Sequence, residues 1–185
     1  MVHMAQQKNY AELNQYHLGI WYSAYRLLIS TGLLLIFLLT YPEVNTDYQY
    51  PQLYYYALGI GVAINTVQLF ALKWIRHLIQ PQLIMIFFSD VCILSLLTLA
   101  SDGPNLQIGL LFVITIFSAS LLLDAKKALV VTLVAVISVI YQHFIGSILA
   151  FFSLSNISNS SLLAFLFCMV YGTGQIAVRR FQILE

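Results

Sequence analysis

Charged side chains are scarce in this sequence. Only 8% of its 185 residues are Asp, Glu, Lys or Arg, whereas 61% are hydrophobic; an ordinary soluble domain carries about 25% charged residues. A water-soluble globule is excluded, because too few polar side chains remain to cover its surface. The net charge of +1 also excludes nucleic-acid binding through a basic face. The composition therefore predicts an integral membrane protein.

Cysteines and catalytic motifs are equally sparse. Cys92 and Cys168 lie inside apolar runs, where we expect them to pack as small apolar residues and not to form a disulfide or a zinc site. The sequence has no nucleophile elbow, no H-E-x-x-H pair, no phosphate-binding glycine loop and no pair of carboxylates suited to acid–base catalysis. We therefore expect no catalytic residue, cofactor or metal site in this chain.

Six apolar runs of about 20 residues, the length that a helix needs to cross the hydrocarbon core, fill most of the chain. Short connections rich in Pro, Gly, Asn, Asp and Ser separate them, and the runs lack the alternation of a membrane β-barrel. The predicted fold is an all-α integral membrane protein, a six-transmembrane-helix bundle. Its expected spans are 21–41, 53–72, 83–100, 106–123, 128–151 and 162–178.

The positive charges predict the orientation, because Lys and Arg near helix ends stay on the cytoplasmic side. With six spans, all eight fall on one side, so both termini are expected in the cytoplasm. In this assignment Arg26 lies before the first span. Tyr22 and Tyr25 lie beside it, among the aromatic residues expected at the headgroup level of the membrane. The four charged pairs are Lys8 with Arg26, Lys73 with Arg76, Lys126 with Lys127, and Arg179 with Arg180.

Residues 1–20 are expected to form a cytoplasmic leader. Apolar or aromatic residues recur there every three or four positions, from Tyr10 to Ala24, which predicts a short interfacial helix. The alternative is a disordered leader, since so short a helix has little stability alone. Residues 21–181 would form the six-helix transmembrane domain and residues 182–185 the C-terminal end.

One ionisable residue, Asp90, lies clearly inside a predicted span, about 12 Å from its cytoplasmic start at 1.5 Å per residue. Asn65 and Tyr171 lie at the same depth on the second and sixth spans, and Ser118 lies slightly nearer the cytoplasm on the fourth. We predict a polar layer of these four residues, with a hydrogen bond between Asp90 and Asn65. This layer either senses a signal or simply holds helices together; both interpretations stay open.

Two further groups of residues suggest helix contacts. Gln142 and His143 form a second polar cluster on the fifth span, either a pH-sensitive pair or a hydrogen-bonding pair between helices. Small residues predict close helix approach on the second, fourth and sixth spans. They are Gly59, Gly61 and Ala63, then Ser118, Ala119 and Ser120, then Gly172 and Gly174.

The region from Asp90 to Gln142 contains a distinctive series of segments. After Asp90 come the turn ASDG at 100–103, the helix LQIGLLFVITIFSASLLL, a basic turn, and KALVVTLVAVISVIYQ. This series resembles the membrane sensor region of the PilS-like family of type IV pilus sensor histidine kinases, although Asp102 stands where that family has a glycine. Tyr22 and Arg26 match the family's Tyr-x-x-x-Arg entry, and Arg179 with Arg180 its basic exit.

The resemblance implies a sensor that signals through its last helix, past Arg179 and Arg180, to cytoplasmic kinase domains. Only those domains would bind ATP; because the chain ends at Glu185 without them, we expect a truncated input domain. In the family the input is the level of the major pilin, and the output partner is a cytoplasmic response regulator. The expected setting is the bacterial inner membrane, with lipid, a pilin helix and a second copy of the chain as partners.

The alternative function is a small six-helix transporter with Asp90 as its coupling site. Such transporters usually contain internal repeats and broken helices at the midplane. The two three-span halves of this sequence show no convincing repeat. A purely structural membrane scaffold also stays open.

Overall fold

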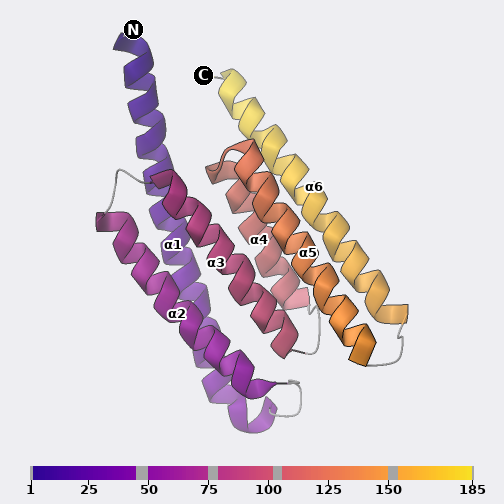
Figure 1. The fold of residues 1–185 in the computed structure, drawn as a ribbon. Coiled ribbons are helices and arrows are strands. Elements are labelled where there is room, and N and C mark those ends of the chain that lie inside the picture. Colours follow the sequence, from indigo (N-terminus) through magenta and orange to yellow (C-terminus); the bar gives the residue numbers. More distant parts are fainter. Residues whose placement is uncertain (1, 45–49, 75–78, 102–105, 150–153, 185) are drawn as a thin grey trace.

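The computed structural model describes residues 2–44, 50–74, 79–101, 106–149 and 154–184, with side chains for 16–40, 50–74, 79–101, 108–141 and 161–178. This part of the chain is all-helical (Figure 1). Its six helices are α1 (Val2–Val44), α2 (Pro51–Trp74), α3 (Ile79–Ala100), α4 (Leu106–Leu122), α5 (Ala125–Leu149) and α6 (Leu154–Leu184). Within the described residues, each predicted span falls on one of these helices, which confirms the all-α fold.

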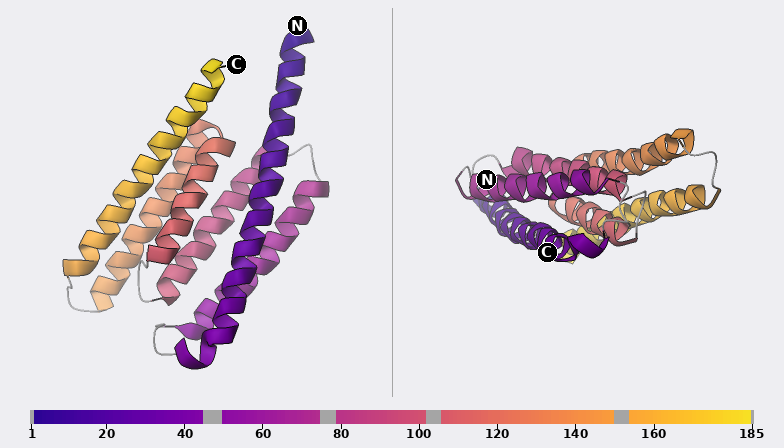
Figure 2. Two further views of the ribbon diagram at one scale, coloured as in Figure 1. Left: turned by 180° about the vertical axis from the view of Figure 1, so that it is seen from behind. Right: turned by 90° about the horizontal axis from the view of Figure 1, so that it is seen from below.

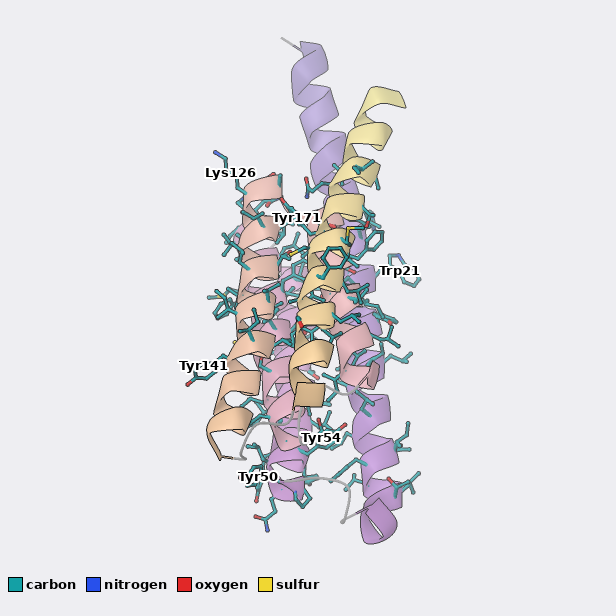
Figure 3. All side chains as sticks on the ribbon, turned by 90° about the vertical axis from the view of Figure 1, so that its right-hand side faces the viewer. Trp21, Tyr50, Tyr54, Lys126, Tyr141 and Tyr171 are labelled. Carbon is teal, nitrogen blue, oxygen red and sulfur yellow. The ribbon has the colours of Figure 1, made fainter. Side chains whose placement is uncertain are left out.

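The helices pack in two layers. Seen along the bundle, α2, α3 and α5 form one layer, and α1, α4 and α6 form the other (Figure 2). Consecutive helices run in opposite directions, so the first and last helices both reach the same end of the bundle (Figure 1). Lys126 lies toward that end and Tyr50 at the opposite end (Figure 3). This arrangement agrees with an even number of crossings and with positive charges on the side of the termini.

Four helical segments among the described residues are long and apolar enough to cross a membrane: Tyr16–Thr40, Pro51–Trp74, Ile79–Ala100 and Ser161–Val178. A shorter apolar segment, Ile108–Leu122, belongs to α4. The expected fifth span, 128–151, falls on α5, whose side chains are described only as far as residue 141. These helices can therefore span a bilayer. Large apolar side chains such as Trp21 point away from the bundle, toward where the lipid would lie (Figure 3).

The leader is not separated from the first span. Helix α1 runs unbroken from Val2 to Val44, and its first turns extend beyond the other helices (Figure 1). The interfacial segment expected before residue 21 is thus the start of the same helix, collinear with the membrane span. An unbroken helix keeps every backbone group of this junction hydrogen-bonded, which the bilayer requires.

Helix α3 lies at the centre of the molecule. Half of the apolar stretch of α3 is buried inside the bundle, against 11% for that of the last span. Leu83, Phe87 and Ala100 are fully enclosed. Because α3 contacts α1, α2, α4 and α5, a polar group on its buried face can reach partners only on these neighbouring helices. Asp90 is such a group.

Small residues bring α4 and α6 close together. A methyl group added at Gly174 would overlap the side chain of Ser120, and one at Gly109 would lie 2.9 Å from Leu163 Cδ2. Added at Gly172, it would meet nothing within 4 Å. The predicted close approach therefore holds for Gly174 but not for Gly172, because the two residues point to different sides of α6.

Candidate functional site

A buried ion pair joins the first and third helices. Arg26 on α1 and Asp90 on α3 are only 7% and 8% exposed, and a terminal guanidinium nitrogen, Nη2, contacts Asp90 Oδ1. The hydroxyl of Tyr22, one turn before Arg26, donates a hydrogen bond to Asp90 Oδ2 at 2.9 Å. Charges at this depth are tolerated only when paired and hydrogen-bonded, and this carboxylate is both.

Helix α2 supplies neutral partners for the same guanidinium. Asn65 Oδ1 accepts a hydrogen bond from Arg26 Nη2 at 2.7 Å, and Gln68 Oε1 accepts one from Nη1 at 3.1 Å. Asn65 and Gln68 are three residues apart and so share one helix face. Ser89 Oγ, next to Asp90, lies 3.5 Å from Nη2. One arginine thereby connects α1, α2 and α3.

Further hydrogen bonds complete this network. Asn65 Nδ2 donates to Ser30 Oγ at 3.1 Å, and Gln68 Nε2 donates to Ser89 Oγ at 2.9 Å. Each amide therefore binds the arginine with its oxygen and a serine with its nitrogen, which orients both amides. We call this group the polar network; its members are Tyr22, Arg26, Ser30, Asn65, Gln68, Ser89 and Asp90.

One donor of the polar network is unused. Arg26 Nε is buried and has no hydrogen-bond partner among the described residues. The guanidinium carbon lies 5.7 Å from the centre of the Tyr22 ring, and that ring packs on Phe87 at 4.8 Å between centroids. A buried N–H without a partner is costly, and this nitrogen is enclosed by the surrounding side chains.

A cavity of about 70 Å³ adjoins the polar network. Helices α1 and α4 provide its sides, and α2 and α3 the remainder. Its polar lining residues include Arg26, Asn65 and Asp90, and the rest of its lining is mostly apolar. The residues that line it on α1 and α4 are Tyr22, Tyr25, Arg26, Ile29, Ser30, Leu33, Leu111, Ile114 and Thr115.

The structure brings together two of the four residues predicted for the polar layer. Asn65 and Asp90 bind the same guanidinium and are bridged by it. Ser118 does not line the cavity, and Tyr171 donates instead to the Ala125 carbonyl at 3.0 Å. The side chains of the other predicted site residues, Gln142, His143, Arg179 and Arg180, lie outside the described part of the chain.

The placement of Arg26 before the first span was wrong. Arg26 lies inside the apolar segment Tyr16–Thr40 and is buried, and Tyr22 is enclosed with it instead of lying in an interfacial belt. The physical reason is pairing: Asp90 needs a cation at its own depth, and Arg26 is there. Its position five residues after the predicted start of the span was the available signal. Gln68 and Ser89 were also missed, since single polar residues in apolar runs are common.

A second group of contacts ties α6 to the turn between α4 and α5. Besides the bond from Tyr171 to Ala125, Gln175 Nε2 donates to the Ser120 carbonyl at 3.4 Å, and Gly174 packs on the Ser120 side chain. Ser120 belongs to the last turn of α4, whose carbonyls lack helical partners. We call these residues, Ser120, Ala125, Tyr171, Gly174 and Gln175, the α6 contact.

Metal chemistry has no evident site in the described residues, where no three His, Cys, Asp or Glu side chains are grouped to hold an ion. The polar network also contains a single carboxylate, and that carboxylate is neutralised by Arg26. Pairing and helix contact are therefore what this arrangement can provide chemically.

Comparison with known proteins identifies the family. The profile of one family, described as the PilS-like transmembrane domain, matches residues 8–180, which include all the described spans. Comparisons with the curated proteins and with the solved structures gave no significant match. The match covers both the polar network and the α6 contact, so neither is an addition outside the family's domain. This multi-pass membrane chain therefore belongs to the PilS-like transmembrane domain family, the membrane input region of PilS-type sensor kinases.

Proposed function

We propose that this domain senses the amount of pilin in the bacterial inner membrane and controls type IV pilus gene expression through a kinase. The observation that carries the proposal is the family match over residues 8–180. In this function a pilin transmembrane helix binds the bundle, and the kinase domains of the full protein pass the change to a cytoplasmic response regulator. The active form is expected to be a homodimer.

The signal leaves through α6. This helix extends beyond the other C-terminal helices toward the end where the termini lie (Figure 1), and the α6 contact couples it to α4. A displacement of α4 therefore carries α6 along, together with the backbone of Arg179 and Arg180. Movement of a helix as a rigid unit is an established way to transmit a signal between sites.

The polar network sets the resting state. Arg26 and Asp90 hold α1 against α3, with Asn65 and Gln68 adding α2. Rearrangement of such a network exchanges one set of hydrogen bonds for another, so two states can differ by only a few kcal/mol. A helix that binds one of these states more tightly shifts the population toward it.

The transporter alternative required Asp90 to exchange its partner during transport. In the structure Asp90 is bound to Arg26 and Tyr22, and no observation among the described residues favours transport. In the sensing function, the bonds of Asp90 to Arg26 and Tyr22 couple α1 to α3.

A reporter assay tests the proposal. The full-length kinase, read from its native gene through to the stop codon, is expressed with a pilin-promoter reporter while pilin is titrated. We expect pilin to lower reporter output, and Asp90→Asn to change this response about fivefold or more. Asp124→Asn is the matched control, because the side chain of Asp124 is 66% exposed and its ion pair among the described residues is with Lys127 at the surface. A pilin-independent reporter with the wild-type protein would refute the function; an unchanged response in Asp90→Asn would refute the role of the network.

A further inference from the structure

Helix α4 reaches the polar network through one hydroxyl group. The side chain of Thr115 is buried and hydrogen-bonded to the hydroxyl of Tyr22 on α1, and both residues line the cavity. Helices α1 and α4 have few contacts with each other, while each packs closely on another helix, α1 on α2 and α4 on α6. Within the described residues, the bond between Tyr22 and Thr115 is thus the polar link from the network to α4.

The two hydroxyl groups have too few protons for all their neighbours. The Tyr22 oxygen lies 2.9 Å from Asp90 Oδ2. On the other side, Thr115 Oγ1 lies 2.9 Å from the Leu111 carbonyl of its own helix. A carboxylate and a carbonyl can only accept, and each hydroxyl carries one proton. The two protons therefore serve three contacts, so the bond between Tyr22 and Thr115 forms only if one of the outer contacts gives up its proton.

The position of Asp90 decides which outer contact gives up its proton. The Leu111 carbonyl also accepts the backbone N–H four residues later in α4, so it loses little without the Thr115 hydroxyl. A carboxylate inside hydrocarbon is costly without its donors. With Asp90 in place, Thr115 therefore donates to Tyr22, and Tyr22 donates to Asp90. When Asp90 moves away, Tyr22 donates to Thr115 instead, and Thr115 donates to Leu111.

From this count of donors and acceptors we infer that Tyr22 and Thr115 form a hydroxyl relay, which reverses its direction with the position of Asp90 and so couples the polar network to α4. Both hydroxyls rotate and neither loses its proton. Thr115 is a positioning residue, because it acts on α4 through its bond to Tyr22. The inference rests on the proposed function for the signal that displaces Asp90, and it adds the contact by which the network reaches the output side.

The two directions of the hydroxyl relay hold α1 and α4 together with different strengths. A hydrogen bond to a charged group is about twice as strong as one between neutral groups, and it polarises the next bond in a chain. The contact between α1 and α4 is therefore strongest while Tyr22 donates to Asp90, and it weakens when that bond breaks. Helix α4 packs on α6 through Ser120 and Gly174, so the change reaches the last helix by direct packing.

Removal of the Thr115 hydroxyl tests the hydroxyl relay. Thr115→Val keeps nearly the same shape without the hydroxyl, and Thr115→Ser keeps the hydroxyl. Thr132→Val on α5 is the matched control, because Thr132 is similarly buried and its hydrogen bond among the described residues is to the Ala128 carbonyl of its own helix. In the full-length kinase with the pilin reporter, we expect Thr115→Val to reduce the pilin response about fivefold or more. Thr115→Ser and Thr132→Val should keep it.

A second measurement needs no pilin. Autophosphorylation of the full-length protein in lipid vesicles is compared for Asp90→Asn, for Thr115→Val and for the double variant. We expect Asp90→Asn to change the rate about fivefold when Thr115 is present, but less than about twofold in the Thr115→Val background. The hydroxyl relay predicts this loss because, without the Thr115 hydroxyl, α4 no longer responds to Asp90.

A double-mutant cycle tests the contact itself. Tyr22→Phe and Thr115→Val are measured singly and together by reversible unfolding in lipid bicelles. We expect their combined effect to differ from the product of the single effects by about threefold or more in the unfolding equilibrium constant. Tyr22→Phe with Thr132→Val is the control pair, whose effects should simply multiply. The same assay reports whether each variant folds, and Thr115→Ala replaces Thr115→Val if the latter does not accumulate in membranes.

The outcomes separate the inference from the proposed function. Equal pilin responses in Thr115→Val and Thr132→Val would overturn the hydroxyl relay and leave the sensing function. Independent effects of Asp90→Asn and Thr115→Val on autophosphorylation would also overturn it, as would an equal loss of response in Thr115→Ser and Thr115→Val. A wild-type reporter that ignores pilin, together with coupled effects on autophosphorylation, would overturn the sensing function and support the relay.

Discussion

The two halves of this bundle are held together by different forces. In α1–α3, an arginine, a carboxylate and two amides connect three helices through hydrogen bonds. In α4–α6, close packing at Gly109 and Gly174 brings α4 against α6. In a bilayer the hydrophobic effect does not drive helices together, so they associate by packing and polar contacts. This chain uses mainly one of these in each half.

The largest expected effect comes from breaking the ion pair. Asp90→Ala leaves the Arg26 charge buried without its counter-ion, and we expect a loss of about 3 kcal/mol in unfolding free energy. Reversible unfolding in lipid bicelles measures it. The double variant Arg26→Leu with Asp90→Leu should recover most of this loss, because no charge is left buried; equal losses in single and double variants would contradict an ion pair.

The next effect concerns packing in the other half. Gly174→Leu forces a side chain into Ser120 and should cost about 2 kcal/mol, as overpacking typically does. Gly172→Leu is the matched control, two residues away with open space at its Cβ position, and should change stability by less than about 0.5 kcal/mol. Similar losses in both variants would show that α6 is not packed as described.

A smaller loss of unfolding free energy is expected when the hydroxyl of Tyr22 or of Tyr171 is removed. Tyr22→Phe removes a hydrogen bond to a carboxylate and should cost about 1.5 kcal/mol. Tyr171→Phe removes one to a neutral backbone carbonyl and should cost about 0.6 kcal/mol, the average for membrane hydrogen bonds. The same unfolding assay measures both. A reversed order would mean that the polar network is not the more strongly bonded half.

The sequence predicted the fold better than the site. Asp90 and Asn65 were placed at one depth from their distances to loops, and both bind Arg26. The arginine itself was assigned to the cytoplasmic side, because charge alone does not tell whether a residue near a span's start faces headgroups or a partner. Ser118 and Tyr171 share that depth range but lie elsewhere around the bundle, since depth fixes height and not direction.

What the sequence alone determined was the class of protein and the course of its spans. Hydropathy and turn residues act locally, and each span must satisfy its own backbone in lipid, so these features can be read without knowing any neighbour. The tertiary structure decided which helix faces meet. It placed Arg26 between Asn65 and Asp90, turned Gly174 toward Ser120 and Gly172 away from it, and left one N–H of the guanidinium buried without a partner. These features depend on the rotation of each helix about its axis, which only packing against the other helices sets.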